Sequence, residues 1–330
     1  MDFNIKVILA WIVFGLVVGI IARFIMPGRQ SMGLIMTILL GIAGSFLGGW
    51  LASLIHGGAI DIWQPANWIG SIVGALLAPG LETRHREDDA RADIRSILDA
   101  GAFSPFFQPI VELHSGRVVG YEALSRFADG GRPDLVFALA ARSGLGLELE
   151  TATLQAAVAA SAVLPPDAHL SLNVSPVMIL SGGLPALLAG HARPFVLEIT
   201  EHVVVEDYAA LQAGINALGP DVRMAVDDAG AGYASLRHIL ELKPDFVKLD
   251  LGLVRGINRD QARQALIAGI GYFAVKRKVR LIAEGIETPA ELKTLLELGI
   301  SHGQGYLLGR PQDSRGPGPW PVTISLPAGS

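Results

Sequence analysis

Three short stretches, FVLEITE (195–201), VRMAVDD (222–228) and FVKLD (246–250), decide the fold of this chain. Each is a run of mostly apolar residues that ends in charged side chains, as expected of a buried strand. Amphipathic stretches at 208–218 and 235–242 separate them and predict helices. Strands that alternate with helices predict a largely parallel sheet covered by helices.

The same alternation extends in both directions from this centre. Further strand-like stretches are FFQPIVEL (106–113), RVVGYEALSRF (117–127), HLSLNVSP (169–176), VRLIAEGIE (279–287) and GYLLG (305–309). Further predicted helices are 134–141, 148–163, 260–275 and 289–298. Eight strands in about 210 residues suit a closed barrel, so we expect an α/β fold with a (β/α)8 TIM-like barrel. An open doubly wound sheet is the alternative, which is less favoured because no glycine-rich phosphate loop follows the first strand.

The composition excludes several classes of protein. The 330 residues include no cysteine, which rules out disulfide frameworks and thiolate metal sites. The formal net charge is −5, which argues against DNA or RNA polymers as partners. Apolar residues make up 51% of the chain and charged residues 17%, and the mean hydropathy is +0.44, which is too apolar for an ordinary soluble protein.

The apolar excess lies in residues 1–80, which contain only five charged side chains. This region predicts a three-helix transmembrane module with spans at about 5–26, 32–55 and 66–81. A cleaved secretory signal is less favoured because no small-residue cleavage site follows the first run. Arginines in the first loop and after the third span place the C-terminal domain in the cytoplasm, with a lipid membrane as a partner.

Two segments flank the barrel domain, which we assign to residues 101–312. Residues 81–100 are charged and carry Ile94, Ile97 and Leu98 on one side, so we expect a charged juxtamembrane linker helix. We interpret it as a solvated spacer, with a dimerising or signal-carrying helix as the alternative. The tail, 313–330, is rich in proline and glycine and is expected to be irregular.

Polar side chains lie at the ends of nearly all predicted strands. In a parallel barrel these ends face one rim, where active sites form. Two carboxylates 4 Å apart repel each other by about 4 kcal/mol at an effective dielectric near 20, and divalent cations relieve that repulsion. All-oxygen ligands favour Mg²⁺ or Mn²⁺, and one aspartate could bridge two ions. The residues concerned are Glu122, Asn173, Glu198, Glu201, Asp227, Asp228, Lys248, Asp250, Glu284, Glu287 and Gln304.

Some of these residues also have plainer interpretations. Glu201 and Glu287 are more readily explained as groups that brace loops, and Asp250 as a helix cap. Asp227 and Asp228 are adjacent, so in a regular strand they would point to opposite faces. Both can reach one site only where the strand ends and turns, and AGAGY (229–233) provides such a turn.

Several motifs resemble those of known families. YEALSRF (121–127) contains the Glu-Ala-Leu signature of the EAL family of cyclic di-GMP phosphodiesterases, and SLNVSP, LEITE, DDAGAGYASL, VKLD, AEGIET and QGYLLGRP follow in the family's order. The N-terminal stretch MPGRQSMGLIMTILLGIAGSFLGG (26–49) resembles the transglycosylase-associated family of small three-span bacterial membrane proteins. Together the resemblances imply a multi-pass protein of the bacterial inner (cytoplasmic) membrane with its barrel in the cytoplasm.

The EAL resemblance implies an activity and a role for each matching residue. The enzyme would hydrolyse cyclic di-GMP to linear pGpG by water attack assisted by two Mg²⁺ or Mn²⁺ ions, as a homodimer formed through the barrel. The implied metal ligands are Glu122, Asn173, Glu198, Asp227 and Asp228, the catalytic residues are Glu284 and Lys248, the substrate contacts are Arg126 and Gln108, and the supporting residues are Glu201, Glu287 and Gln304.

Three residues depart from the family's usual pattern. Ala229 and Ala231 stand where the family often has larger or polar residues, which puts the packing of that loop in question, and Ser301 stands where an aspartate is common. None of the three is an implied metal ligand. Two other functions stay open, namely a catalytically inactive cyclic di-GMP receptor and a membrane interaction platform.

Overall fold

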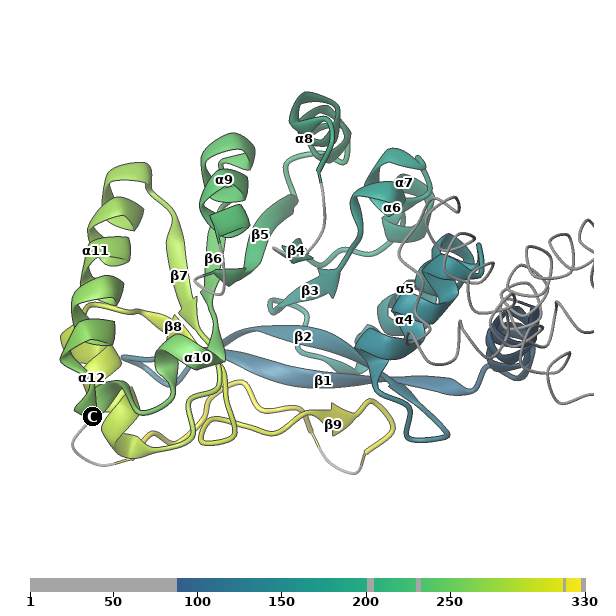
Figure 1. Cartoon of the computed structure of the whole chain (residues 1–330). Coiled ribbons are helices and arrows are strands. Elements are labelled where there is room, and N and C mark those ends of the chain that lie inside the picture. Colours follow the sequence, from purple (N-terminus) through teal and green to yellow (C-terminus); the bar gives the residue numbers. More distant parts are fainter. Residues whose placement is uncertain (1–87, 201–204, 230–232, 317–318, 328–330) are drawn as a thin grey trace, which may run out of the picture. The chain divides into compact units, whose positions relative to one another are not determined.

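The computed structural model describes residues 88–200, 205–229, 233–316 and 319–327. The three predicted transmembrane spans, Glu201 and Ala231 lie outside these residues. Within the described ranges, no helix is both long and apolar enough to cross a bilayer. The chain divides into two compact units between residues 92 and 93, and the second unit, 93–330, contains the barrel (Figure 1).

Eight strands close into a barrel, as expected from the sequence. Strands β2 to β8 are parallel and lie in chain order, and β1 closes the ring by pairing with both β2 and β8. The strands are β1 Phe103–Glu112, β2 Val118–Phe127, β3 His169–Asn173, β4 Phe195–Thr200, β5 Val222–Ala229, β6 Phe246–Leu249, β7 Arg280–Ala283 and β8 His302–Gly303, and a short strand outside the barrel, β9 Gln312–Asp313, pairs with β1.

The first strand differs from the (β/α)8 expectation. β1 runs antiparallel to β2 and β8, and residues 113–117, all of them described, join it to β2 as a hairpin with no helix. So short a connection can only join antiparallel neighbours, because a parallel crossover needs about a dozen residues. Gly116 supplies the turn with a φ of 74°, and its amide donates to the Glu112 carbonyl.

Helices cover the outside of the barrel (Figure 1). Helices α4 Pro133–Arg142 and α5 Gly146–Ala160 follow β2, α6 Pro176–Leu180 and α7 Leu184–Leu188 follow β3, α8 Tyr208–Asn216 follows β4, α9 Tyr233–Leu242 follows β5, α10 Leu251–Val254 and α11 Gln261–Arg277 follow β6, and α12 Pro289–Glu297 follows β7. Local chemistry sets their starts. For example, α12 begins at Pro289 because Thr288 and Glu291 form a capping box around its first turn.

Separate hydrophobic clusters lie on the two sides of the barrel wall. The larger one fills the space between strands and helices and includes Leu170 and Leu172 of β3. The smaller one lies inside the barrel and consists of Ile110, Val196, Ala225, Phe246 and Ile282. Because successive strand residues point to opposite sides, β3 directs His169, Ser171 and Asn173 inward.

The predicted eighth strand, GYLLG (305–309), is wrong. The structure places β8 earlier, at His302–Gly303, and residues 305–309 turn back onto the loop after β7. There the Ile286 amide donates to the Gln304 carbonyl, and the Leu307 amide donates to the Ile286 carbonyl. Gly305 approaches so closely that a Cβ on it would lie 2.2 Å from the Ile286 nitrogen. These contacts use the backbone groups that a strand would need, so Gln304 follows the end of β8 instead of opening it.

The described part of the linker, residues 88–100, is a helix, and its residues from Ile94 onward pack against the barrel domain. Ile94 is fully buried, and Ile97 and Leu98 are partly buried beside it. Arg95 forms an ion pair with Glu148 of α5 at 2.5 Å. The cluster around Ile94 consists of Phe127, Ala140, Leu145 and Leu149. This end of the linker is therefore packed on α4 and α5 instead of being solvated on all sides.

Candidate metal and catalytic site

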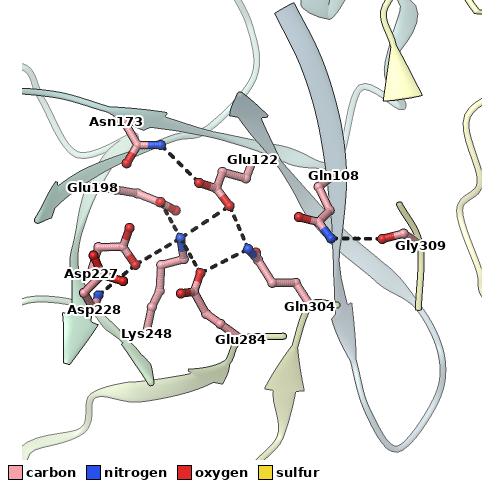
Figure 2. A network of polar contacts seen from close by, with 10 residues as sticks. All are labelled: Gln108, Glu122, Asn173, Glu198, Asp227, Asp228, Lys248, Glu284, Gln304 and Gly309. Atoms are coloured by element: carbon pink, nitrogen blue, oxygen red, sulfur yellow. Dashed lines mark hydrogen bonds and ion pairs between the residues drawn. The ribbon is translucent and has the colours of Figure 1, made fainter. Parts of the chain in front are cut away.

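Lys248 of β6 lies at the centre of the site (Figure 2). Its side chain is fully buried, and Nζ lies 2.7 Å from Glu198 Oε2 and 2.8 Å from Glu284 Oε1. The same atom lies 3.2 Å from Asp227 Oδ1 and 3.4 Å from Glu122 Oε2. The carboxylates come from β2, β4, β5 and the end of β7. The parallel strands thus bring side chains that are distant in the sequence to one mouth of the barrel.

Two adjacent aspartates reach this site because β5 is irregular at its end. The pairing of β5 with β6 shifts register between Val226 and Ala229, and Asp228 has a φ of 55°. A left-handed conformation costs a non-glycine residue roughly 1–2 kcal/mol, so the surrounding structure must hold it in place. The Asp228 amide donates to Asp227 Oδ1 at 3.0 Å. In this conformation both carboxylates lie within reach of Glu284.

Two side-chain amides donate hydrogen bonds to the carboxylates and orient them. Gln304 Nε2 donates to Glu122 Oε2 at 2.7 Å and to Glu284 Oε1 at 3.1 Å. Asn173 Nδ2 donates to Glu122 Oε1 at 3.0 Å. Glu122 is therefore held at both oxygens, while Gln304 links the end of β8 to both β2 and the loop after β7 (Figure 2).

Burial and charge crowding shift the pKa values of these groups. Burial raises the pKa of Glu198 to about 8, and the charges of Glu122 and Asp227 add to this rise against the opposing effect of Lys248. Burial likewise raises the pKa of Glu284 well above its usual value. Burial acts in the same direction on Glu122, but Lys248, Gln304 and Asn173 together lower its pKa.

The central lysine stays charged. Burial by itself would lower the pKa of Lys248, but the surrounding carboxylates raise it well above its usual value. At neutral pH the cluster therefore contains one ammonium and fewer negative charges than it has carboxyl groups, because Glu198 and Glu284 tend to keep their protons.

The donor set fits divalent cations. Glu122, Glu198 and Asp227 each offer one oxygen within 4.8 Å of the others, and so do Asp227, Asp228 and Glu284. Asp227 belongs to both groups and is placed to bridge two ions. Glu198 Oε1 and Gln304 Oε1 are buried without a hydrogen-bond partner among the described residues, as expected of oxygens that face a ligand. Donors that are all oxygen suit Mg²⁺, Mn²⁺ or Ca²⁺.

The two expected substrate contacts lie in different surroundings. Gln108 is buried and lies directly opposite Glu122 in the β1–β2 register, and its Nε2 donates to the Gly309 carbonyl at 3.0 Å (Figure 2). Arg126 lies near the end of β2, where its guanidinium is 5.8 Å from the centre of the Phe106 ring. The structure therefore places Gln108 beside the carboxylates and turns Arg126 toward β1.

The remaining candidates brace loops or cap helices. Glu287 Oε1 forms an ion pair with Arg255 at 2.5 Å, which ties the loop after β7 to the end of α10. Asp250 caps α10 by accepting from the Gly252 amide at 2.7 Å. Ser301 Oγ lies 2.8 Å from Nδ1 of the histidine that follows it, so its hydroxyl is engaged before β8 begins.

Glu150 of α5 also supports the site, although no local motif distinguishes it. Its Oε1 accepts from the Ser175 amide at 2.6 Å and its Oε2 accepts from the Ser175 hydroxyl at 2.7 Å. Ser175 lies two residues after Asn173 and caps α6 by accepting from the Met178 amide. The serine–proline pair at 175–176 is a helix-start signal, but nothing local in the sequence points to a partner 25 residues earlier.

Comparisons with known proteins agree with this geometry. Residues 91–311 match the family model described as the EAL domain. Among curated relatives, the uncharacterized protein Rv1354c of Mycobacterium tuberculosis is 31% identical over 241 residues, which covers 68% of this chain and 39% of the relative. The probable cyclic di-GMP phosphodiesterase PdeN of Escherichia coli is 27% identical over 271 residues, which covers 76% of this chain and 51% of the relative. The chain thus spans only about two fifths to one half of these relatives.

Solved structures show the same likeness. The manganese and cyclic di-GMP complex of Klebsiella pneumoniae BlrP1 aligns with a TM-score of 0.58 at 29% identity, over 64% of this chain and 57% of that one. The cyclic di-GMP complex of the PaMucR phosphodiesterase aligns with a TM-score of 0.60 at 27% identity, over 68% of this chain and 97% of that one. Because the family match covers two thirds of the sequence and includes the strands that build the site, this chain belongs to the EAL domain family.

Proposed function

We propose that this protein is a phosphodiesterase that hydrolyses cyclic di-GMP to linear pGpG. One observation carries the proposal: five carboxylates gather at one mouth of the barrel in two groups of three that share Asp227, and four of the five lie within 3.4 Å of Lys248 Nζ. The relatives support it, because several are named as cyclic di-GMP phosphodiesterases and the similar solved structures contain cyclic di-GMP.

The metal ions would be held by the residues that already converge. Glu122, Asn173, Glu198 and Asp227 would hold one divalent cation, and Asp227 and Asp228 would hold the second. When bound, two such ions supply an activated water and neutralise charge on the phosphodiester. Mg²⁺ and Mn²⁺ fit this set of oxygens best.

The protein's own side chains would position the substrate and move the proton. Lys248 brings a permanent positive charge to the site and would contact the phosphate oxygens. Glu284 would take the proton of the attacking water once bound cations have displaced its own proton, and its raised pKa makes the carboxylate a stronger base. Gln304 orients Glu284 and Glu122, and Gln108 and Arg126 would contact the dinucleotide.

Three further features belong to the same proposal. The apolar runs at 5–26, 32–55 and 66–81 would anchor the protein in the bacterial inner membrane with the barrel in the cytoplasm. The barrel would form a homodimer, as the EAL resemblance implies. The resemblance of 26–49 to the transglycosylase-associated family stays a prediction. Membrane fractionation and the mass of the detergent-solubilised protein test the anchor and the dimer.

The activity is tested with the full chain in detergent or lipid, supplied with Mg²⁺ or Mn²⁺ and cyclic di-GMP. We expect linear pGpG to form, and Glu122→Ala and Glu284→Gln each to abolish it. Glu297→Gln, the same change as the second at an exposed position of α12, is the matched control and should leave turnover intact. Binding without turnover would favour the receptor function, and neither binding nor turnover would favour an interaction platform.

A further inference from the structure

The C-terminal segment beyond the family match pairs with β1 and with the β1–β2 hairpin of the barrel. The EAL match ends at residue 311, yet β9 pairs with Phe106 and Phe107 of β1. Residues 319–327 then pair with the β1–β2 hairpin, where the Val118 amide donates to the Val322 carbonyl at 2.9 Å and the Ile324 amide donates to the Gly116 carbonyl at 2.7 Å. The segment covers strands whose hairpin connection brings no helix to cover them.

Trp320 is the anchor of this segment. Its ring packs edge-on against Phe107, with centroids 5.6 Å apart, and against Tyr121, with centroids 5.3 Å apart. The Tyr121 hydroxyl donates to the carbonyl of Pro321, the next residue. Phe107 and Tyr121 are both fully buried. Edge-on aromatic pairs are stabilising beyond the area that they bury, so these two ring contacts fix Trp320 on the outer side of β1 and β2. We call Trp320, Phe107 and Tyr121 the aromatic clamp.

Phe107 and Tyr121, which Trp320 contacts, are the chain neighbours of two residues at the site. Phe107 precedes Gln108 and Tyr121 precedes Glu122, and Gln108 and Glu122 lie opposite each other in the β1–β2 register. Successive strand residues point to opposite sides, so Trp320 contacts the outer side of the peptides that carry Glu122 and Gln108 inward. Distances between a metal ion and its ligands vary by only about 0.2 Å, so a small shift of these strands would move the Glu122 carboxylate out of ligating position.

We propose that Trp320, which lies beyond the EAL match, is a positioning residue for the metal ligand Glu122 in this protein. Trp320 acts through Tyr121 and Phe107 and does not touch the substrate. The part of this inference that concerns turnover rests on the proposed phosphodiesterase activity. The part that concerns cation affinity does not.

The test compares variants of the full chain by three readouts, namely Mn²⁺ affinity by calorimetry, kcat and KM for cyclic di-GMP, and thermal unfolding. Trp320→Ala should weaken Mn²⁺ binding about tenfold or more and lower kcat by a similar factor, at a temperature where the variant is folded. Trp320→Phe keeps an aromatic ring between Phe107 and Tyr121 and should recover most of both. Leu326→Ala is the control, because it removes a partly buried side chain near the hairpin turn, away from the aromatic clamp.

Leu326→Ala should lower the melting temperature without changing Mn²⁺ affinity. Equal Mn²⁺ affinity in Trp320→Ala and the wild type would overturn the inference, and so would an equal loss of affinity in Leu326→Ala. If Trp320→Ala does not fold, Trp320→Phe and Trp320→Leu decide, since only the leucine variant should lose affinity. A wild type that binds Mn²⁺ without turnover would contradict the phosphodiesterase proposal and leave the affinity comparison to judge Trp320 alone.

Discussion

Replacing Lys248 with methionine tests whether one buried ammonium compensates the carboxylates around it. Methionine keeps an unbranched side chain that is one atom shorter, and it removes the charge. At an effective dielectric near 20, opposite unit charges about 3 Å apart attract by about 5–6 kcal/mol. Lys248 has four carboxyl groups between 2.7 and 3.4 Å, of which Glu198 and Glu284 tend to stay protonated at neutral pH. Desolvation of the lysine and repulsion among the carboxylates offset most of that attraction.

The net cost follows from measurements on buried charge pairs. Removing one partner of such a pair destabilises a protein by about 3–5 kcal/mol. For a domain of this size each kcal/mol lowers the melting temperature by about 2–4 °C, so Lys248→Met should melt about 6–20 °C below the wild type without metal. Turnover of cyclic di-GMP should also be lost.

The stability lost in Lys248→Met should depend on pH. Without the ammonium, the folded-state pKa values of Glu198 and Glu284 rise further above those of the unfolded chain, and an acid with a raised pKa destabilises the folded state as the pH increases. The loss of stability should therefore be larger at pH 8 than at pH 6. Mn²⁺ should stabilise the variant more than the wild type, because the ion replaces the missing charge.

Thermal unfolding at both pH values, with and without Mn²⁺, is the assay. Lys276→Met, at an exposed position of α11, is the matched control and should melt as the wild type does. A Lys248→Met protein that melts within about 2 °C of the wild type at pH 8 without metal would refute the reasoning, because the carboxylates would then not depend on the lysine for charge compensation.

Three other predictions concern the barrel interior. The pKa of Glu198 is raised to about 8, so a cation that binds below pH 8 must displace a proton. The apparent Mn²⁺ affinity should therefore rise by up to about tenfold per pH unit between pH 6 and 8. Calorimetry that detects no proton release on binding would contradict this. Burial lowers the pKa of His169 from 6.5 to about 4. The free energy of unfolding should therefore carry no penalty from His169 above pH 6.5 and should fall by about 3 kcal/mol as the pH drops to 4. A His169→Leu variant with the same acid sensitivity as the wild type would refute this. A Cβ at Gly120 would lie 2.2 Å from His169 Nε2, so Gly120→Ala should lower the free energy of unfolding by about 1–3 kcal/mol. Adding His169→Ala should recover part of that loss in a double-mutant cycle. Purely additive effects of the two substitutions would exclude the clash.

Local sequence determined most of the parallel part of this barrel, strands β2 to β7. Stretches such as FVLEIT (195–200) and VRMAVDD (222–228) are strands in the structure because a short apolar run between turn signals has few other ways to be buried. The polar residues at their ends converged for the same reason, since strands that are all parallel must end at one mouth. The adjacent pair Asp227 and Asp228 even indicated that the backbone had to turn there, as the φ of Asp228 shows.

Tertiary contacts decided the rest. β1 is antiparallel because its connection to β2 is too short for a crossover, and GYLLG is a turn because its backbone groups bond to Ile286, about twenty residues earlier. Four carboxylates meet Lys248 through a geometry that no single motif specifies. Trp320 packs behind Glu122 from some 200 residues away along the chain. Periodicity reports which side of an element is buried, but it carries no information about which distant segment will cover that side.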